Sequence, residues 1–211
     1  QGHLQPAIEE LREAASTFPE NDPTRAAILL LQGRIQLHMN RPSEALEIAR
    51  KAFEAGRDYP AQAEAQALAA LAHALLNHED EALTVFEGYR SLYRSLPETI
   101  VNRNDNALLG TMALYAGRLQ EATVRLAEAA GTIQDREPWR DEQIPFLYGH
   151  ALWKAGQHSE AITWLERFTG STVGRARSPI EFVRSLYMLG DAYGSTAVSY
   201  THLTLPTNRE V

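Results

Sequence analysis

The sequence contains no cysteine among its 211 residues, which excludes disulfides, thiolate zinc sites and cysteine nucleophiles. It has no apolar run near the roughly 20 residues that a membrane-spanning helix needs, and no secretory signal is recognisable at Gln1. We therefore predict a protein that does not insert into a membrane. We predict a cytoplasmic location, with the periplasm as the alternative because the chain starts without an initiator methionine and an upstream segment is expected.

Positive charge is also scarce. The formal net charge is −7 and the isoelectric point is about 5.5, whereas nucleic-acid backbones and anionic membranes attract a basic face. The hydrophobic content of 44% is enough for a real core. We therefore expect no nucleic-acid partner, and composition leaves the oligomeric state open.

Enzyme signatures are missing as well. The sequence holds no P-loop, dinucleotide-binding glycine motif, H-E-x-x-H, G-x-S-x-G or EF-hand loop. The closest histidines, His73 and His78, are five residues apart, the wrong spacing for two ligands on one helical face. Acidic runs at 79–81 and 135–142 are interpreted as solvated turns and first helical turns, not as acid–base pairs. We predict no enzyme, no cofactor and no metal site.

Three tryptophans could suggest a ligand box. Trp164 neighbours a predicted core leucine, and Trp153 follows a small residue within a predicted helix. Trp139 opens a predicted helix and could pack against a neighbouring repeat. We interpret all three as packing residues.

What the sequence does contain is a repeated pattern. Five stretches align without gaps, each with Gly or Asn first and Ala five residues later, at 2–8, 40–46, 77–83, 117–123 and 156–162. They recur every 37 to 40 residues. Gly and Asn enter left-handed backbone conformation at low cost and commonly end helices. In four stretches Glu precedes the Ala, in a first turn where the helix dipole favours a carboxylate. Each stretch therefore predicts the end of one helix and the start of the next.

The repeated Ala marks the second helix of each pair. Residues four and seven positions after it share its face and predict a buried stripe: Leu11 and Ala14, Ala49 and Ala52, Phe86 and Tyr89, Leu126 and Ala129, Leu165 and Phe168. Twelve residues before the Ala lies another small residue, which predicts a close approach of the first helix to its partner: Gly33, Ala70, Gly110 and Gly149.

This arrangement resembles the tetratricopeptide repeat (TPR), a pair of antiparallel helices with small residues at fixed positions. The period here is longer than in that family, and its usual Trp is replaced by Leu29, Gln66, Asn106 and Pro145. The resemblance covers about residues 2–193. It implies an all-α fold, a right-handed α-solenoid of antiparallel helix pairs that forms a TPR-like superhelix.

Turn and capping residues set the expected boundaries. Asp22-Pro23 and Ser178-Pro179 are helix-start signals, and Pro97 and 170–174 separate pairs. The predicted helices are 4–17, 23–39, 42–56, 60–76, 79–95, 101–116, 118–131, 139–155, 158–169 and 179–193. In residues 1–195 we expect a half-repeat at 1–20, pairs at about 22–58, 60–96, 100–133 and 138–170, and a half-repeat at 178–195.

The last residues break the repeat. The phase requires Ala near 202 and an apolar residue near 206, but His202 and Pro206 stand there, and the stretch from Ser195 is Thr-rich and strand-like. The tail at 198–211 resembles translated sequencing-adapter read-through. We therefore expect residues 196–211 to be non-native or disordered, with a divergent last helix as the alternative. We also expect the whole chain to be a fragment of a longer bacterial protein.

The resemblance implies a partner-binding surface, because the first helices of TPR pairs line a concave face. By phase, the residues on that face are Arg34, His38, Leu71, Leu75, Asn104, Thr111, Tyr115, His150, Lys154, Arg184, Tyr187 and Asp191. Aromatic rings mixed with cations and amides suit an extended peptide or a helix, whereas the plain alternative is a solvated surface.

We predict a protein–protein interaction scaffold that binds a peptide or partner protein. A regulatory or sensor region of a larger signalling protein (a kinase, cyclase or transcription regulator) whose effector domain is missing is the alternative. An enzyme built on a helical scaffold is a third hypothesis.

Overall fold

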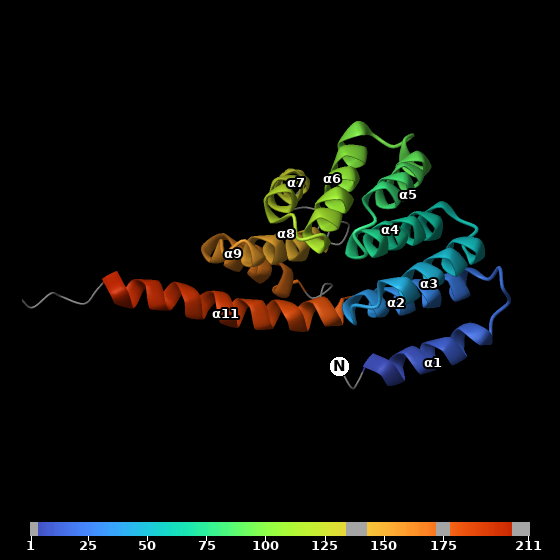
Figure 1. Ribbon diagram of the computed structural model, residues 1–211, viewed down its shortest axis with the longest axis horizontal. Coiled ribbons are helices and arrows are strands. Elements are labelled where there is room, and N and C mark those ends of the chain that lie inside the picture. The colour runs from blue at the N-terminus through green and yellow to red at the C-terminus, as the bar shows by residue number, and fades with distance from the viewer. Residues whose placement is uncertain (1–3, 134–142, 172–177, 204–211) are drawn as a thin grey trace, which may run out of the picture. The chain divides into compact units, whose positions relative to one another are not determined.

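The computed structural model describes residues 4–133, 143–171 and 178–203. Within these ranges the chain forms ten α-helices and no strand (Figure 1), and none of these helices is long and apolar enough to cross a membrane. The chain divides into two compact units, residues 1–117 and residues 118–211. The all-helical prediction is confirmed for the described residues.

The helices follow the predicted boundaries closely. The first unit contains α1 (Leu4–Ser16), α2 (Pro23–His38), α3 (Pro42–Ala55), α4 (Tyr59–Leu75), α5 (Glu79–Tyr93) and α6 (Glu98–Tyr115). The second contains α7 (Leu119–Gly131), α8 (Gln143–Lys154), α9 (His158–Thr169) and α11 (Pro179–Leu203). The predicted start of the helix at 139 lies outside the described residues; apart from that position and the end of α11, the described ends lie within three residues of the predicted ones.

The end of α11 differs from the prediction. We expected the helix to stop at 193 and the chain to become strand-like from Ser195, but α11 continues to Leu203. Threonine lowers helix propensity by only a few tenths of a kcal/mol, and the first residue that cannot continue a helix is Pro206. The residues after 203 lie outside the described part of the chain.

The predicted left-handed helix ends are confirmed. Backbone φ is +57° to +77° at four of the five positions that the repeat pattern marks: Asn40, Asn77, Gly117 and Gly156. The fifth, Gly2, lies outside the described residues. Behind three of these four the next amide N–H donates to the carbonyl five residues back at 2.9–3.0 Å: Arg41 to Gln36, His78 to His73 and Gln157 to Leu152. This Schellman closure satisfies helix-end carbonyls, so each turn is a local consequence of its Gly or Asn.

Two helices of the first unit begin with an aspartate cap. Asp22 accepts from the Thr24 amide at 2.7 Å, and Asp58 accepts from the Ala61 amide at 3.0 Å. A proline follows each cap in the first turn, where its missing N–H costs no hydrogen bond. The start of α11 at Pro179 also matches the sequence prediction.

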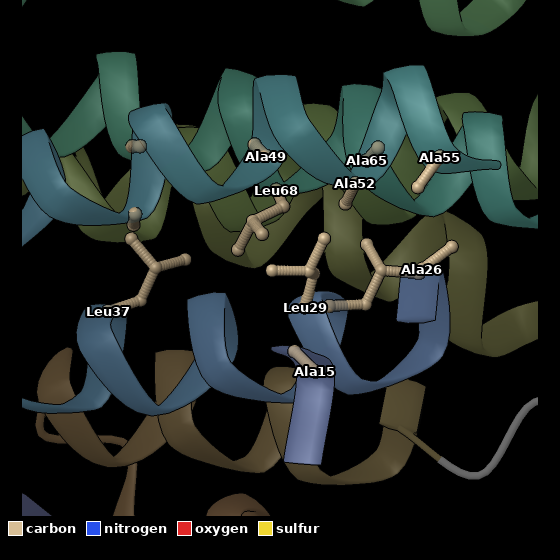
Figure 2. Packing of buried hydrophobic residues seen from close by; sticks show 12 residues of the cluster. Ala15, Ala26, Leu29, Leu37, Ala49, Ala52, Ala55, Ala65 and Leu68 are labelled. Carbon is tan, nitrogen blue, oxygen red and sulfur yellow. The ribbon is translucent and has the colours of Figure 1, made fainter. Parts of the chain in front are cut away.

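Helices of the first unit pack as a series, each against the next, and α4 also contacts α2 and α6 (Figure 1). Figure 2 shows Leu29 of α2 pointing toward Ala52 of α3 and Leu68 of α4. The small residues of α3 are 0–2% exposed: Ala45, Ala49, Ala52 and Ala55. Alanine leaves room for neighbouring backbones to approach, so the predicted close helix packing is confirmed here.

In the second unit, α7, α8, α9 and α11 also pack in order, and α8 contacts α11 directly. Gly149 of α8 lies so close to α9 that an added Cβ would stand 2.8 Å from Cγ of Leu165. An added Cβ at Gly33 of α2 would instead overlap Leu68 of α4, with Ile48 of α3 at 3.4 Å. The predicted crossing within a pair is confirmed at Gly149, whereas Gly33 chiefly makes room for the next pair.

One predicted stripe is displaced. In α1 the fully covered residues are Ile8 and Ala15, whereas Ala7, Leu11 and Ala14 are half-buried. Among the described helices α1 packs against α2, the helix that follows it. The side of α1 that would face a preceding helix therefore has less cover. The stripe prediction is therefore wrong for α1 by one residue.

Candidate functional site

The predicted binding residues lie on the first helices of the pairs. Four of them are exposed: Arg34, Lys154, Tyr187 and Asp191. Four are half-buried: His38, Asn104, Tyr115 and Arg184. Thr111 and His150 are each 3% exposed, and Leu71, Leu75 and Tyr115 pack against the core of the first unit.

The structure contradicts the predicted exposure of two binding residues, Thr111 and His150, which are buried. The Thr111 hydroxyl donates to the Ala107 carbonyl at 2.7 Å within its own helix. The His150 ring lies between Phe146 and Trp153, with centroid distances of 5.7 and 6.2 Å. First helices contact neighbours on several sides, so the face left for a partner is narrower than the phase suggested. Thr111 and His150 present almost no surface to a ligand.

An aromatic cluster joins α8 to α11 in the second unit. The Trp153 indole N–H donates to Asp191 Oδ2 at 2.7 Å, and the Tyr187 ring stands edge-on to the indole at 6.4 Å. Tyr187 is 70% exposed, and Lys154 follows Trp153 at the exposed end of α8. We call Trp153, Tyr187 and Asp191 the α8–α11 cluster; it combines aromatic surface with a carboxylate and borders a cation.

A second, smaller group lies on α2. Leu31 is 43% exposed, Arg34 is exposed one turn later, and His38 is half-buried one turn beyond that. Their spacing of three and four residues places them on one helical face. We call these three residues the α2 face, which offers an apolar side chain beside a guanidinium.

Buried polar groups elsewhere link helices. The Tyr93 hydroxyl donates to Asp105 Oδ1 at 2.6 Å, and Arg90 Nε lies 3.0 Å from Asp105 Oδ2. Burial, followed by the bond to Asp105, raises the pKa of Tyr93 well above its usual range. The neighbouring Tyr89, whose ring lies 4.5 Å away, has a pKa raised by burial to about 12. These groups stabilise the α5–α6 contact.

A similar contact joins α8 to α9. The Tyr148 hydroxyl donates to Glu160 Oε1 at 2.9 Å, and burial followed by this bond raises the pKa of Tyr148 to about 12. Trp164 stands edge-on to Tyr148 at 5.2 Å, and the Arg167 guanidinium lies 5.4 Å from the indole centroid. The packing interpretation of Trp164 is thus confirmed, whereas Trp139 lies outside the described residues.

The histidine pair is closer than its spacing suggested. The rings of His73 and His78 are 6.0 Å apart, because the left-handed turn at Asn77 folds the chain back after α4 ends. Burial lowers the pKa of His73, opposed by the charge of Glu81, and His73 Nδ1 is buried without a hydrogen-bond partner. The expectation that a spacing of five residues keeps these two rings apart is therefore wrong. Even so, the described residues contain no cluster of three or more His, Asp or Glu side chains suited to a metal ion.

Only the first of the two acidic runs lies in the part of the chain that the structure describes. Glu79, Asp80 and Glu81 occupy the exposed first turn of α5, as predicted. The run at 135–142 lies outside the described residues.

No protein-family model and no curated protein sequence matches this chain.

Proposed function

We propose that this chain is a protein-interaction scaffold of the TPR kind, which binds a peptide or partner protein on its first helices. The observation that carries the proposal is the α8–α11 cluster, where Trp153 and the 70%-exposed Tyr187 meet beside Asp191. Exposed aromatic side chains that are held in place by neighbours are typical of binding surfaces, because they bury large area at low entropic cost.

The cluster is held in a fixed arrangement. The bond from the Trp153 indole to Asp191 ties side chains that are 38 positions apart in the sequence. A surface that is already ordered loses less conformational entropy when a ligand binds. Lys154, at the exposed C-terminal end of α8, can meanwhile attract a ligand carboxylate. An extended peptide with aromatic or aliphatic and acidic side chains would match this combination.

The α2 face supports the same function in the first unit by itself. Arg34 is exposed beside Leu31, so an apolar contact and a charge-assisted hydrogen bond are available within one helical turn. Each unit therefore carries its own candidate surface, and the two can be tested separately.

The test is selection from a displayed library of random linear peptides, followed by affinity measurement on the enriched sequences. Charge reversal at Arg34, Lys154 and Arg184 should weaken binding about tenfold or more, since it replaces attraction of carboxylates by repulsion. A matched variant reverses Lys51, Arg57 and Arg94, which are exposed outside the two candidate surfaces. Binding should survive in that control.

Reversal at Arg34 alone and at Lys154 alone then assigns each peptide to one unit. Equal affinity of wild type, the triple variant and the control would contradict the proposal, as would enrichment of no peptide at all.

A further inference from the structure

Two glycines that occupy equivalent places in their helices have opposite surroundings. Gly149 of α8 is covered by α9, and an added Cβ would lie 2.8 Å from Leu165 Cγ and 3.2 Å from the Leu165 amide nitrogen. Gly190 of α11, 41 residues later, has no atom within 4 Å of that position. The place where a second helix packs closely on α8 is open on α11.

The neighbours of the two glycines show the same contrast. Around Gly149, the side chains of Pro145, Phe146 and Leu152 are buried. Their counterparts 41 residues later are 50%, 70% and 46% exposed: Leu186, Tyr187 and Tyr193. We call Leu186, Tyr187, Gly190 and Tyr193 the open face of α11. Exposed apolar residues that are contiguous on one helix mark an interaction site more often than scattered ones do.

A matching surface occurs on α1. Ala7, Leu11 and Ala14 stand in the repeat phase of Ala161, Leu165 and Phe168 of α9. The three residues of α9 are at most 1% exposed, whereas those of α1 are half-buried. The other in-phase alanines, Ala45, Ala82 and Ala122, are also at most 1% exposed. We call Ala7, Leu11 and Ala14 the open face of α1; among the described second helices it alone leaves its repeat Ala half-covered.

We propose that the open face of α11 docks the open face of α1 from a second copy of this chain. Antiparallel docking in the register of α8 and α9 sets Leu11 against Gly190, as Leu165 lies against Gly149. The same register sets Ala14 against Tyr187, where α8 and α9 place Phe146 and Phe168 with ring centroids 5.5 Å apart. The methyl group of Ala14 would face the ring of Tyr187 at the place where α8 and α9 hold two aromatic rings. The smaller pair of side chains fits there without a clash.

The second copy is favoured over other occupants because it continues the packing order already present. In the second unit α11 follows α9 as the next first helix, and α1 is a second helix that lacks cover on the side where a first helix packs. Each copy would use a different face, so the interface is heterologous and each added copy leaves one open face at either end. A heterologous contact does not close at two copies by symmetry, so the complex should grow beyond a dimer, as an open chain or a ring.

The test is sedimentation velocity of the full chain over a range of concentrations up to about 200 µM, where a small interface becomes populated. The weight-average mass should rise steadily above the monomer mass of 23.5 kDa. Gly190→Arg should abolish the rise because its side chain fills the space for the incoming helix. That variant should keep its fold, since Gly190 lies in open space and Arg has the higher helix propensity.

The complementary variant is Ala7→Arg, which blocks the open face of α1 and also should remain monomeric. A mixture of the two variants tests the polarity directly. Gly190→Arg retains the face on α1 and Ala7→Arg retains the face on α11, so the mixture should form a one-to-one dimer and nothing larger. Circular dichroism of each variant checks that the helices remain formed, and Leu186→Asp repeats the block on α11 at a second position.

The matched control is Val124→Arg on α7, which replaces a 55%-exposed apolar residue outside both open faces and should associate like wild type. Four results would overturn the proposal. These are a wild-type chain that stays monomeric at every concentration, loss of association in Val124→Arg, association of Gly190→Arg alone, or a closed dimer that Ala7→Arg leaves unchanged. The last result would indicate pairing of α11 with α11.

Discussion

The hydroxyl of Tyr93 donates a 2.6 Å hydrogen bond to Asp105 and thereby joins α5 to α6. Asp105 also receives Arg90 on its other oxygen at 3.0 Å, and its side chain is only 13% exposed. A carboxylate removed from water in this way is stable only while its oxygens have donors. The contact is therefore a sensitive point of the first unit.

Replacing Tyr93 with Phe tests that contact. The variant leaves Asp105 Oδ1 without its donor, so the free energy of unfolding should fall by about 1–3 kcal/mol, measured by urea denaturation. Tyr59→Phe is the control, because Tyr59 is 39% exposed and its change should stay within about 0.5 kcal/mol. Equal effects of the two substitutions would show that the bond adds nothing to stability.

The two glycines of α8 and α11 give a second prediction with opposite signs. Gly149→Ala should destabilise the chain by about 1–3 kcal/mol, because the new methyl group must displace Leu165. Gly190→Ala should raise stability by up to about 1 kcal/mol, since it adds helix propensity in open space. Chemical denaturation of both variants measures this, and a change of the same sign at both positions would contradict the packing described for α8 and α9.

Alkaline pH should weaken the fold through its buried tyrosines. The pKa of Tyr89 and of Tyr148 is raised from 10.0 to about 12, so the folded state favours the protonated phenol. This contribution is fully present below pH 10 and is lost as the pH rises through about 12. The free energy of unfolding should fall across that window. Tyr148→Phe should flatten the fall, whereas an unchanged slope would show that Tyr148 ionises equally easily in the unfolded chain.

Mild acid should have a smaller effect through His73. Burial lowers the pKa of His73 from 6.5, so the folded state favours the neutral imidazole. Its contribution is present above pH 6.5 and is lost as the pH falls through the lowered value. An NMR titration should give a midpoint below 6.5 for His73. His73→Leu should reduce the loss of stability on acidification, and a midpoint at or above 6.5 would contradict the described burial.

The sequence predicts the helices well because their signals are local. The turns at Asn40, Asn77, Gly117 and Gly156 depend on residues that can adopt positive φ, and such residues can be recognised without knowing any tertiary contact. Asp22 and Pro23 mark the start of α2 in the same way. Likewise, the repeat phase predicts the buried alanines of α3, α5, α7 and α9, which are Ala45, Ala82, Ala122 and Ala161. It does not predict that Ala7 of α1 is only half-buried.

The candidate binding surface is harder to predict because it depends on contacts between helices. The bond between Trp153 and Asp191 joins residues 38 positions apart, and nothing in the local pattern indicates it. Phase alone placed Thr111 and His150 on the binding face, but neighbouring helices bury them. The pairing of His73 with His78 was missed because a helical spacing rule does not hold across a turn.

The most direct test of the repeated helix pair is to enlarge one in-phase alanine. Ala161 is fully buried in α9, the helix that packs on α8. Urea denaturation should show that Ala161→Leu costs about 1–3 kcal/mol by overpacking the crossing. Thr163→Leu, at an exposed position on the same helix, should change stability by less than about 0.5 kcal/mol. If both variants unfold at the same urea concentration as wild type, α9 does not cross its neighbour at Ala161, and the account of paired helices closed by small residues is contradicted.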